Sequence, residues 1–272
     1  MTNDLTTILI PVDRNRASDE QLRLAGDLAR QLGARIVGVI ACEHSPALYY
    51  ETGVLAYDPI AEDRERLSAL MAAEEERFRA VLGPGHASIE WRSAVGWPTD
   101  FALCEARSAD LIVSFVGPGT ADDVDLGALV LKAGRPVLLL HDKALPLAGR
   151  VLVAWKDARE ARRAVRDALP FLSRASAVRL IEIVEGEGSQ TAARERVNDV
   201  ATWLRTHGIE ASTSTARSQG SVPDDLDAAA REFDADLIVA GAYGHSRLGE
   251  WIFGGVTRHL TTCAGRAVLL SH

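Results

Sequence analysis

The sequence repeats itself, and this repeat is the feature that most limits what the chain can fold into. Residues 109–113 read Ala-Asp-Leu-Ile-Val and recur identically as residues 235–239. Residues 134–141 return as residues 265–272, with Gly-Arg, Val-Leu-Leu and His at the same positions. Matches that recur in the same order indicate a duplicated structural unit rather than chance.

A third match lies near the start of each half and sets the domain count. Residues 8–12, Ile-Leu-Ile-Pro-Val, resemble residues 151–155, Val-Leu-Val-Ala-Trp. We therefore expect two tandem copies of one domain, at residues 1–142 and 148–272. Each copy has the length of an ordinary domain.

The two copies differ in length at two places. The offsets between matching segments are 143, 126 and 131 residues in chain order. The first copy is therefore 17 residues longer before the Ala-Asp-Leu-Ile-Val segment, and we place the excess within residues 44–76. The second copy is 5 residues longer after that segment.

Both copies read as strands alternating with helices. Apolar runs that predict buried parallel strands lie at residues 8–12, 36–40, 111–115, 137–140, 151–155, 178–184, 237–240 and 267–270. Helices are predicted at residues 20–32, 159–172 and 191–207, and a charged helical run at residues 62–78. This alternation indicates an open, mostly parallel α/β sheet in each copy, with ligands bound beyond the carboxyl ends of the strands. Residues 137–140 and 268–270 are expected to be edge strands whose pairing within the chain forms a pseudo-dimer.

A glycine-rich segment, residues 241–257, follows the fourth predicted strand of the second copy. Its glycines have the spacing G-x2-G-x9-G-G and lie at Gly241, Gly244, Gly254 and Gly255. Glycine lets backbone N–H groups approach an anion closely, and the following helix adds a positive N-terminus. The segment predicts a phosphate-binding loop, to which His245 and Arg247 can add side-chain donors. The alternative is that the glycines serve only a tight loop and close helix packing.

The order of these features resembles the universal stress protein family, and the tandem organisation resembles its two-domain members. The resemblance implies two Rossmann-like domains of the adenine-nucleotide α-hydrolase-like fold, with ATP, with or without Mg²⁺, as the ligand. It assigns Ala154, Trp155 and Lys156 to the tip of the first strand and Ile183 to the adenine-side position. The matching phosphate-loop residues are Gly241, Gly244, Gly254, Gly255 and Val256.

The second copy departs from the family pattern at two of these positions. Gly255 stands where the family usually has Ser or Thr, which removes a hydroxyl donor to phosphate. Lys156 stands where an acidic residue usually ends the first strand, and Asp157 comes one place later. The first copy keeps that acidic residue as Asp13.

The first copy has an acidic segment in place of the glycine loop. Counting back from the shared Ala-Gly-Arg sequence aligns Asp123 and Val124 with Gly254 and Gly255. Carboxylates at a phosphate position repel an anion, and side chains replace the bare backbone that would contact it. We therefore expect one ATP per chain, in the C-terminal domain.

Composition excludes several other functions. A net charge of −8 argues against nucleic-acid binding, because phosphate backbones need a basic face. The sequence contains no apolar run of membrane-spanning length, and from its polar start at residues 1–4 we expect no signal peptide. Its scattered cysteines, Cys42, Cys104 and Cys263, have neither disulfide nor zinc spacing and fit the cytoplasm.

We expect neither a catalytic residue nor a metal site. The stretch 244–248 lacks the final glycine of a hydrolase nucleophile elbow, and no histidine pair has metal-ligand spacing. The expected function is thus a stress-response or regulatory protein that binds ATP, and not an enzyme. Weak ATP hydrolysis stays open, although the sequence identifies no general base. The alternative function is a nucleotide-free pseudo-dimeric scaffold that acts through a homodimer or another protein partner.

Overall fold

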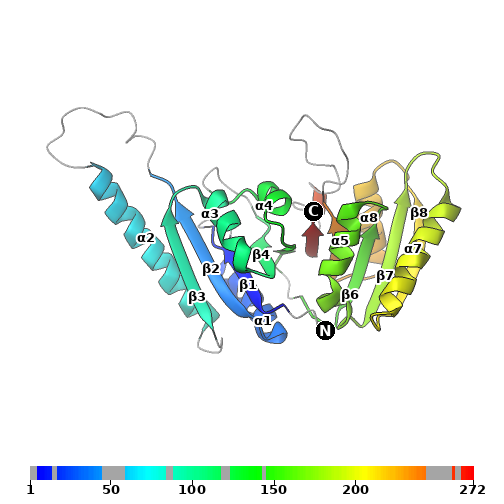
Figure 1. The fold of residues 1–272 in the computed structure, drawn as a ribbon, viewed down its shortest axis with the longest axis horizontal. Helices are drawn as coiled ribbons and strands as arrows, with labels where there is room; N and C mark the ends of the chain where they lie inside the picture. The colour runs from blue at the N-terminus through cyan, green and yellow to red at the C-terminus, as the bar shows by residue number, and fades with distance from the viewer. Residues whose placement is uncertain are drawn as a thin grey trace.

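The computed structural model describes residues 5–13, 17–44, 59–83, 88–117, 123–142, 145–242, 259–260 and 265–272. These residues form a ten-stranded sheet with helices on both faces (Figure 1). The strand order is β3-β2-β1-β4-β5-β10-β9-β6-β7-β8, so each half of the chain contributes five consecutive strands.

The elements of the two halves follow the same succession. The N-terminal elements are β1 (Thr7–Pro11), α1 (Asp19–Leu32), β2 (Arg35–Cys42), α2 (Pro59–Leu82), β3 (Ile89–Val95), α3 (Pro98–Glu105), the 3₁₀ turn η2 (Ala106–Ser108), β4 (Leu111–Phe115), α4 (Leu126–Lys132) and β5 (Val137–Leu140). The C-terminal elements are β6 (Arg150–Trp155), α5 (Arg159–Asp167), α6 (Leu169–Leu172), β7 (Ala177–Val184), α7 (Gln190–Arg205), β8 (Ala211–Arg217), α8 (Val222–Glu232), β9 (Leu237–Gly241) and β10 (Ala267–Ser271).

The two halves meet where β5 pairs with β10. This pair is antiparallel, with Leu138 opposite Leu269, whereas the other strand pairs of the sheet are parallel. Each strand covers what would otherwise be an open edge of the other half. The predicted intrachain pseudo-dimer is therefore confirmed, and so is the α/β class with its mostly parallel sheet.

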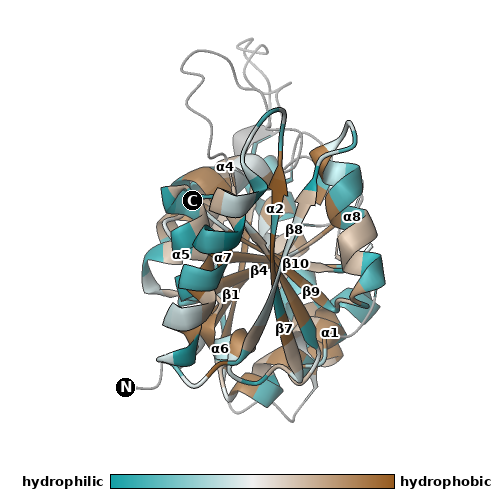
Figure 2. Cartoon of the chain, turned by 90° about the vertical axis from the view of Figure 1, so that its right-hand side faces the viewer, coloured by the Kyte–Doolittle hydropathy of each residue, from teal (hydrophilic) through white to brown (hydrophobic). Residues whose placement is uncertain are grey.

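Apolar strands sandwiched between helices make the core. Figure 2 shows hydrophobic strands at the centre and hydrophilic colour on the outward faces of the helices. Successive strand residues face opposite sides, so Val151 and Val153 join the cluster beneath α1, α5 and α7, while Leu152 joins the cluster beneath α3, α4 and α8. Because both faces are covered, the central strands read as continuous apolar runs.

The edge strands were missed by the apolar-run criterion. β3 alternates Ile89 and Trp91 with Glu90 and Arg92, and β8 is built of Ala, Ser, Thr and Arg. Edge strands are half exposed, so their sequences need not be apolar. Neither strand was predicted, and neither were α3, α4 and α8.

One predicted helix is wrong as a single element. The stretch 159–172 divides at Ala168 into α5 and α6. Pro170 lies at the start of α6, where a missing N–H is tolerated, but the same residue inside a continuous helix would remove a backbone hydrogen bond. The helices predicted at residues 20–32 and 191–207 are α1 and α7, and the helical run predicted at residues 62–78 lies within α2 (Pro59–Leu82).

Candidate functional site

The candidate site lies where β6 and β9 end. β6 is parallel to both of its neighbours, β7 and β9. The helix that follows β6 packs on one face of the sheet through Ala161 and Val165, whereas Leu260, which comes after β9, packs on the other face. Ligands of open α/β sheets bind at such a switch point. We call residues 156–160 and 241–242 the C-terminal switch point.

The N-terminal half has an equivalent place. β1 lies between β2 and β4 and is parallel to both. The helix α1 packs on one face through Leu22, and α4 packs on the other through Leu129. We call the residues that follow β1 and β4, represented by Asp13 and Val116, the N-terminal switch point.

Two of the predicted site residues share a face beside the C-terminal switch point. Ala154 of β6 and Ile183 of β7 are both partly buried and pack against the same cluster as Ala240 and Ala242. Trp155 points to the opposite face, where it is buried in the cluster that α5 covers. The structure thus brings Ala154 and Ile183 together and separates the Trp155 ring from them.

Gly241, the last residue of β9, touches the first turn of α5. A Cβ added to Gly241 would lie 2.5 Å from the backbone nitrogen of Ala161 and 2.6 Å from the backbone carbon of Glu160. Backbone atoms cannot swing aside as a side-chain end can, so a larger residue here would push the helix away from the strand. Close packing is therefore one physical reason for glycine at this position.

Lys156 follows β6 and is half exposed. Its Nζ lies 3.3 Å from Oε2 of Glu185, which follows β7. The next residue, Asp157, pairs with Arg162 of α5. The C-terminal switch point therefore presents a lysine directly after its central strand, where the N-terminal switch point presents Asp13.

The N-terminal switch point is filled by the chain's own carboxylates. Oδ1 of Asp13 accepts a hydrogen bond from the backbone N–H of Val124 at 3.0 Å, and both residues are buried. Oδ1 of Asp125 accepts from the N–H groups of Gly127 and Ala128 at 2.8 and 3.1 Å and so caps α4. The amides at the start of α4 therefore already have carboxylate partners, which goes beyond the repulsion expected from the sequence.

The remaining predicted site residues lie outside the described part of the chain. They are Gly244, His245, Arg247, Gly254, Gly255 and Val256. Their assignment to a phosphate loop stays a prediction.

Two side chains that the site prediction missed meet at the C-terminal switch point. Nδ1 of His272 lies 3.0 Å from the carbonyl oxygen of Ala242, and its Nε2 lies 3.4 Å from NH2 of Arg159. Arg159 and His272 each follow a predicted strand, so the sequence indicates that both lie at the carboxyl edge of the sheet. Their meeting depends on the strand order β10-β9-β6, which the sequence alone does not reveal.

The rest of the described structure offers two histidine–carboxylate pairs. His44 Nδ1 lies 2.8 Å from Oδ2 of Asp63, and His259 Nε2 lies 2.6 Å from Oδ2 of Asp227. Across the described ranges, His, Cys, Asp and Glu side chains nowhere gather in a group of three or more that could hold a metal ion. Among the described helices, none is long and apolar enough to cross a membrane.

Comparisons with known proteins agree on the fold. The Universal stress protein family profile matches residues 148–271. A universal stress protein from Archaeoglobus fulgidus DSM 4304 is 18% identical in sequence, with a TM-score of 0.67, and the match covers 97% of this chain and 95% of that chain. A functionally unknown protein from Pseudomonas aeruginosa PAO1 is 16% identical, with a TM-score of 0.60 and coverage of 98% and 92%. No curated protein sequence matches the chain significantly.

The family match and the fold point to the same conclusion. The profile spans β6 to β10, the half that contains the C-terminal switch point. The structural neighbours span both halves and so match the tandem arrangement. Residues 148–271 therefore match the universal stress protein family, and the chain as a whole shares the fold of the solved universal stress protein from Archaeoglobus fulgidus.

Proposed function

We propose that this chain is a stress-response or regulatory protein that binds one adenine nucleotide, ATP with or without Mg²⁺, at the C-terminal switch point. The observation that carries the proposal is the opposite charge of the residue that follows the central strand in each half. In the N-terminal half, Asp13 follows the central strand, and its carboxylate accepts a hydrogen bond from the backbone N–H of Val124. In the C-terminal half, Lys156 follows the central strand, and its positively charged side chain attracts an anion.

The proposed roles follow from the face that each residue occupies. Ala154 and Ile183 offer an apolar surface for the adenine, and the backbone beside Trp155 borders the nucleoside. Lys156 is placed to balance phosphate charge, in exchange for its half-exposed pair with Glu185. Gly241 begins the predicted glycine loop, whose later glycines, together with His245, Arg247 and Val256, would hold the phosphates.

The N-terminal domain is proposed to bind no nucleotide. A phosphate there would have to displace the carboxylates of Asp13 and Asp125 from the three backbone N–H groups that donate hydrogen bonds to them. It would also approach the buried carboxyl group of Asp123. With domains taken as residues 1–142 and 148–272, each chain would carry one ATP as a sensed or structural ligand in the cytoplasm, without turnover.

The experiment is to purify the protein without added nucleotide, denature it, and assay the supernatant for adenine nucleotide. We expect either co-purified nucleotide or a rise in melting temperature with Mg-ATP, since a ligand that binds only the folded state stabilises it. A blank assay together with no thermal shift would refute nucleotide binding and favour the pseudo-dimeric scaffold that acts through protein partners.

A matched pair of substitutions tests the glycine loop itself. Gly244→Asp adds a side chain and a negative charge to the proposed phosphate loop and should weaken ATP binding at least tenfold. Gly117→Asp makes the same change at an exposed glycine after β4, in the N-terminal half, and should leave ATP affinity unchanged. Equal affinities in the two variants would remove the loop from the binding site.

A further inference from the structure

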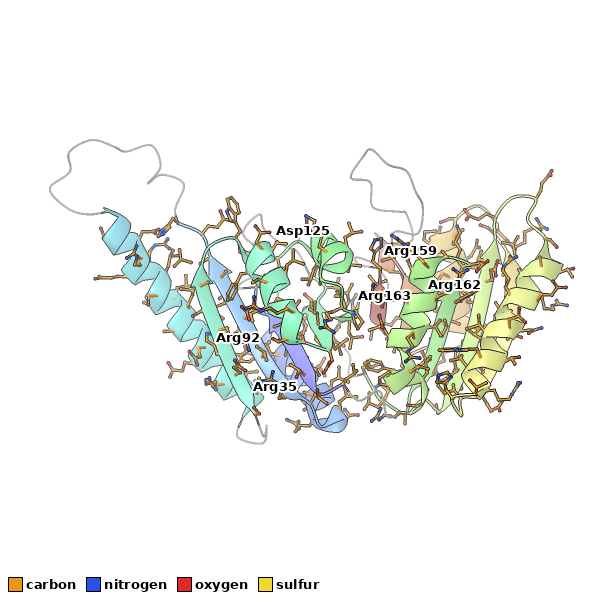
Figure 3. The ribbon with its side chains drawn as sticks, in the orientation of Figure 1. Arg35, Arg92, Asp125, Arg159, Arg162 and Arg163 are labelled. Carbon is orange, nitrogen blue, oxygen red and sulfur yellow. The ribbon has the colours of Figure 1, made fainter. Side chains whose placement is uncertain are left out.

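Arg159 lies at the carboxyl edge of the sheet, beside the start of the predicted glycine loop. It is the first residue of α5, and 77% of its side chain is exposed. The two residues that follow it, Glu160 and Ala161, touch Gly241 through their backbones. Figure 3 shows Arg159 at the upper end of α5, with Arg162 and Arg163 farther along the helix.

Arg159 is held in this place by His272. A carbonyl oxygen only accepts hydrogen bonds, so the 3.0 Å contact to Ala242 places a proton on Nδ1 of His272. Arginine only donates, so Nε2 of the neutral ring accepts from NH2 of Arg159 at 3.4 Å. The ring thus links the guanidinium to Ala242, the residue directly after β9.

The carboxylate of Glu160 also contacts the Arg159 guanidinium. Its side chain is buried, and burial opposes ionisation. Hydrogen bonds from Arg159 and from its own backbone N–H, with the charge of Arg159, nevertheless lower the pKa of Glu160 below its usual value. The ionised Glu160 accepts from Nε of Arg159. Two of the five guanidinium N–H donors are engaged in these contacts, which leaves donors for an exposed anion.

The neighbouring arginines have different surroundings. Arg162 pairs with Asp157, and Arg163 donates to the carbonyl oxygen of Gly134 at 3.1 Å, across the junction with the N-terminal half. Of the three arginines labelled on α5 in Figure 3, Arg159 is the one that contacts a residue fixed to the end of β9.

We infer that Arg159 binds the terminal phosphates of a nucleoside polyphosphate, and that His272 is the positioning residue that holds the guanidinium near Ala242. This inference rests on the proposed nucleotide binding and sharpens its substrate class. Arginine binds phosphate through paired, charge-assisted hydrogen bonds. Because His272 links Arg159 to Ala242, directly after Gly241, the proposed role is to discriminate a triphosphate from a monophosphate rather than one base from another.

The test compares Arg159→Gln with Arg162→Gln, which removes the same charge one turn along the helix. Titration calorimetry at fixed ionic strength measures the affinities for ATP, AMP and inorganic tripolyphosphate. We expect Arg159→Gln to weaken the binding of ATP and of tripolyphosphate about tenfold, which is the usual effect of losing a charge-assisted hydrogen bond. The affinity for AMP should fall less than twofold. Arg162→Gln should change the affinities for all three ligands less than twofold.

His272 is tested through its coupling to Arg159. His272→Ala should lower the preference for ATP over AMP about as much as Arg159→Gln, and the double variant should lower it no further. His272→Gln, whose amide also donates and accepts, should restore part of the preference. Melting temperatures without ligand monitor the fold of each variant separately.

The outcomes separate this inference from the proposed function. If the wild type binds ATP and Arg159→Gln behaves like Arg162→Gln, the role of Arg159 is refuted and nucleotide binding stands. If the wild type binds tripolyphosphate in an Arg159-dependent manner but neither ATP nor AMP, nucleotide binding is refuted and the phosphate-binding role stands. Binding of none of the three ligands overturns both.

Discussion

At the scale of single residues, the two domains differ most at the position that follows the central strand. Asp13 is buried and bonded to a backbone amide, whereas Lys156 is half exposed and pairs with Glu185 across two strand ends. A buried carboxylate that accepts an N–H is a fixed part of its domain. A surface ion pair is weak and can be exchanged for a ligand. The same place in the fold is thus structural in one half and available in the other.

Substitution of Asp13 tests its structural role. Asp13→Ala leaves the buried N–H of Val124 without its acceptor and should lower the free energy of unfolding by about 1–3 kcal/mol. Asp13→Asn retains an oxygen acceptor and should cost less. Urea unfolding measures both, with Asp27→Ala, at an exposed pair with Arg30, as a control that changes stability by about 0.5 kcal/mol or less. An alanine variant as stable as this control would contradict the role of Asp13.

At the scale of elements, a chain of ion pairs joins β2, β3 and α3 on one face of the N-terminal half. Glu90 accepts from Nε of Arg92 at 2.8 Å and from NH1 of Arg35 at 3.2 Å. Arg92 also pairs with the buried Glu105 of α3, which lies 3.5 Å from Arg107. The alternating charges hold the edge strand β3 and the helix beside it, although β3 has only one neighbouring strand.

This chain of ion pairs makes the N-terminal edge sensitive to acid. The hydrogen bond from Arg92 lowers the pKa of Glu90 below its usual value of 4.5, assisted by the charges of Arg92 and Arg35 and opposed by slight burial. A carboxyl group with a depressed folded-state pKa stabilises the fold above its unfolded pKa and loses that effect as pH falls. Wild type should therefore be more stable than Glu90→Gln at pH 7, and the difference should shrink as pH falls below the unfolded-state pKa and vanish only below the depressed folded-state pKa.

Chemical unfolding of both proteins between pH 3 and pH 7 measures this difference. The glutamate is partly exposed, so added salt should reduce the advantage of the wild type at pH 7. A difference that is the same at pH 3 and pH 7 would show that Glu90 acts through packing rather than charge.

At the scale of the whole molecule, the β5–β10 pair makes one continuous sheet from two domains. Leu138 and Leu269 face each other in this pair, and both are fully buried. The helix α5 also reaches across the junction, since Arg163 donates to the carbonyl oxygen of Gly134. Neither half can expose its edge at the junction without uncovering the other, so the two halves should unfold together.

Leu269→Ala tests this coupling. Loss of a buried leucine should lower the free energy of unfolding by about 2–5 kcal/mol. Hydrogen exchange should show β1 and β6 losing protection together in both proteins. In the variant this joint loss should occur at a lower denaturant concentration than in the wild type. Leu67→Ala removes a buried leucine from the separate small cluster under α2 and is the control for a local effect. Destabilisation of the C-terminal strands alone by Leu269→Ala would refute joint unfolding.

The sequence by itself determined the duplication, the central strands and the edge of the sheet at which the candidate site lies. These features follow from repeated segments and from the apolar runs of strands buried on both faces, which are local patterns. It also indicated the β5–β10 pairing, because two open apolar edges in one chain need covering. The predicted roles of Gly244 to Val256 belong to this local part and await the ligand-binding test.

Only the tertiary structure decided which distant groups meet. The Asp13 carboxylate and the Val124 amide are 111 residues apart, and Arg159 and His272 are 113 residues apart. The edge strand β3 pairs with β2 and carries ion pairs on one face, and its sequence contains no apolar run. The physical reason is the same in each case. A hydrogen bond or ion pair between distant residues depends on the strand order and on the face of the sheet on which each helix packs. The periodicity of a single segment determines neither of them.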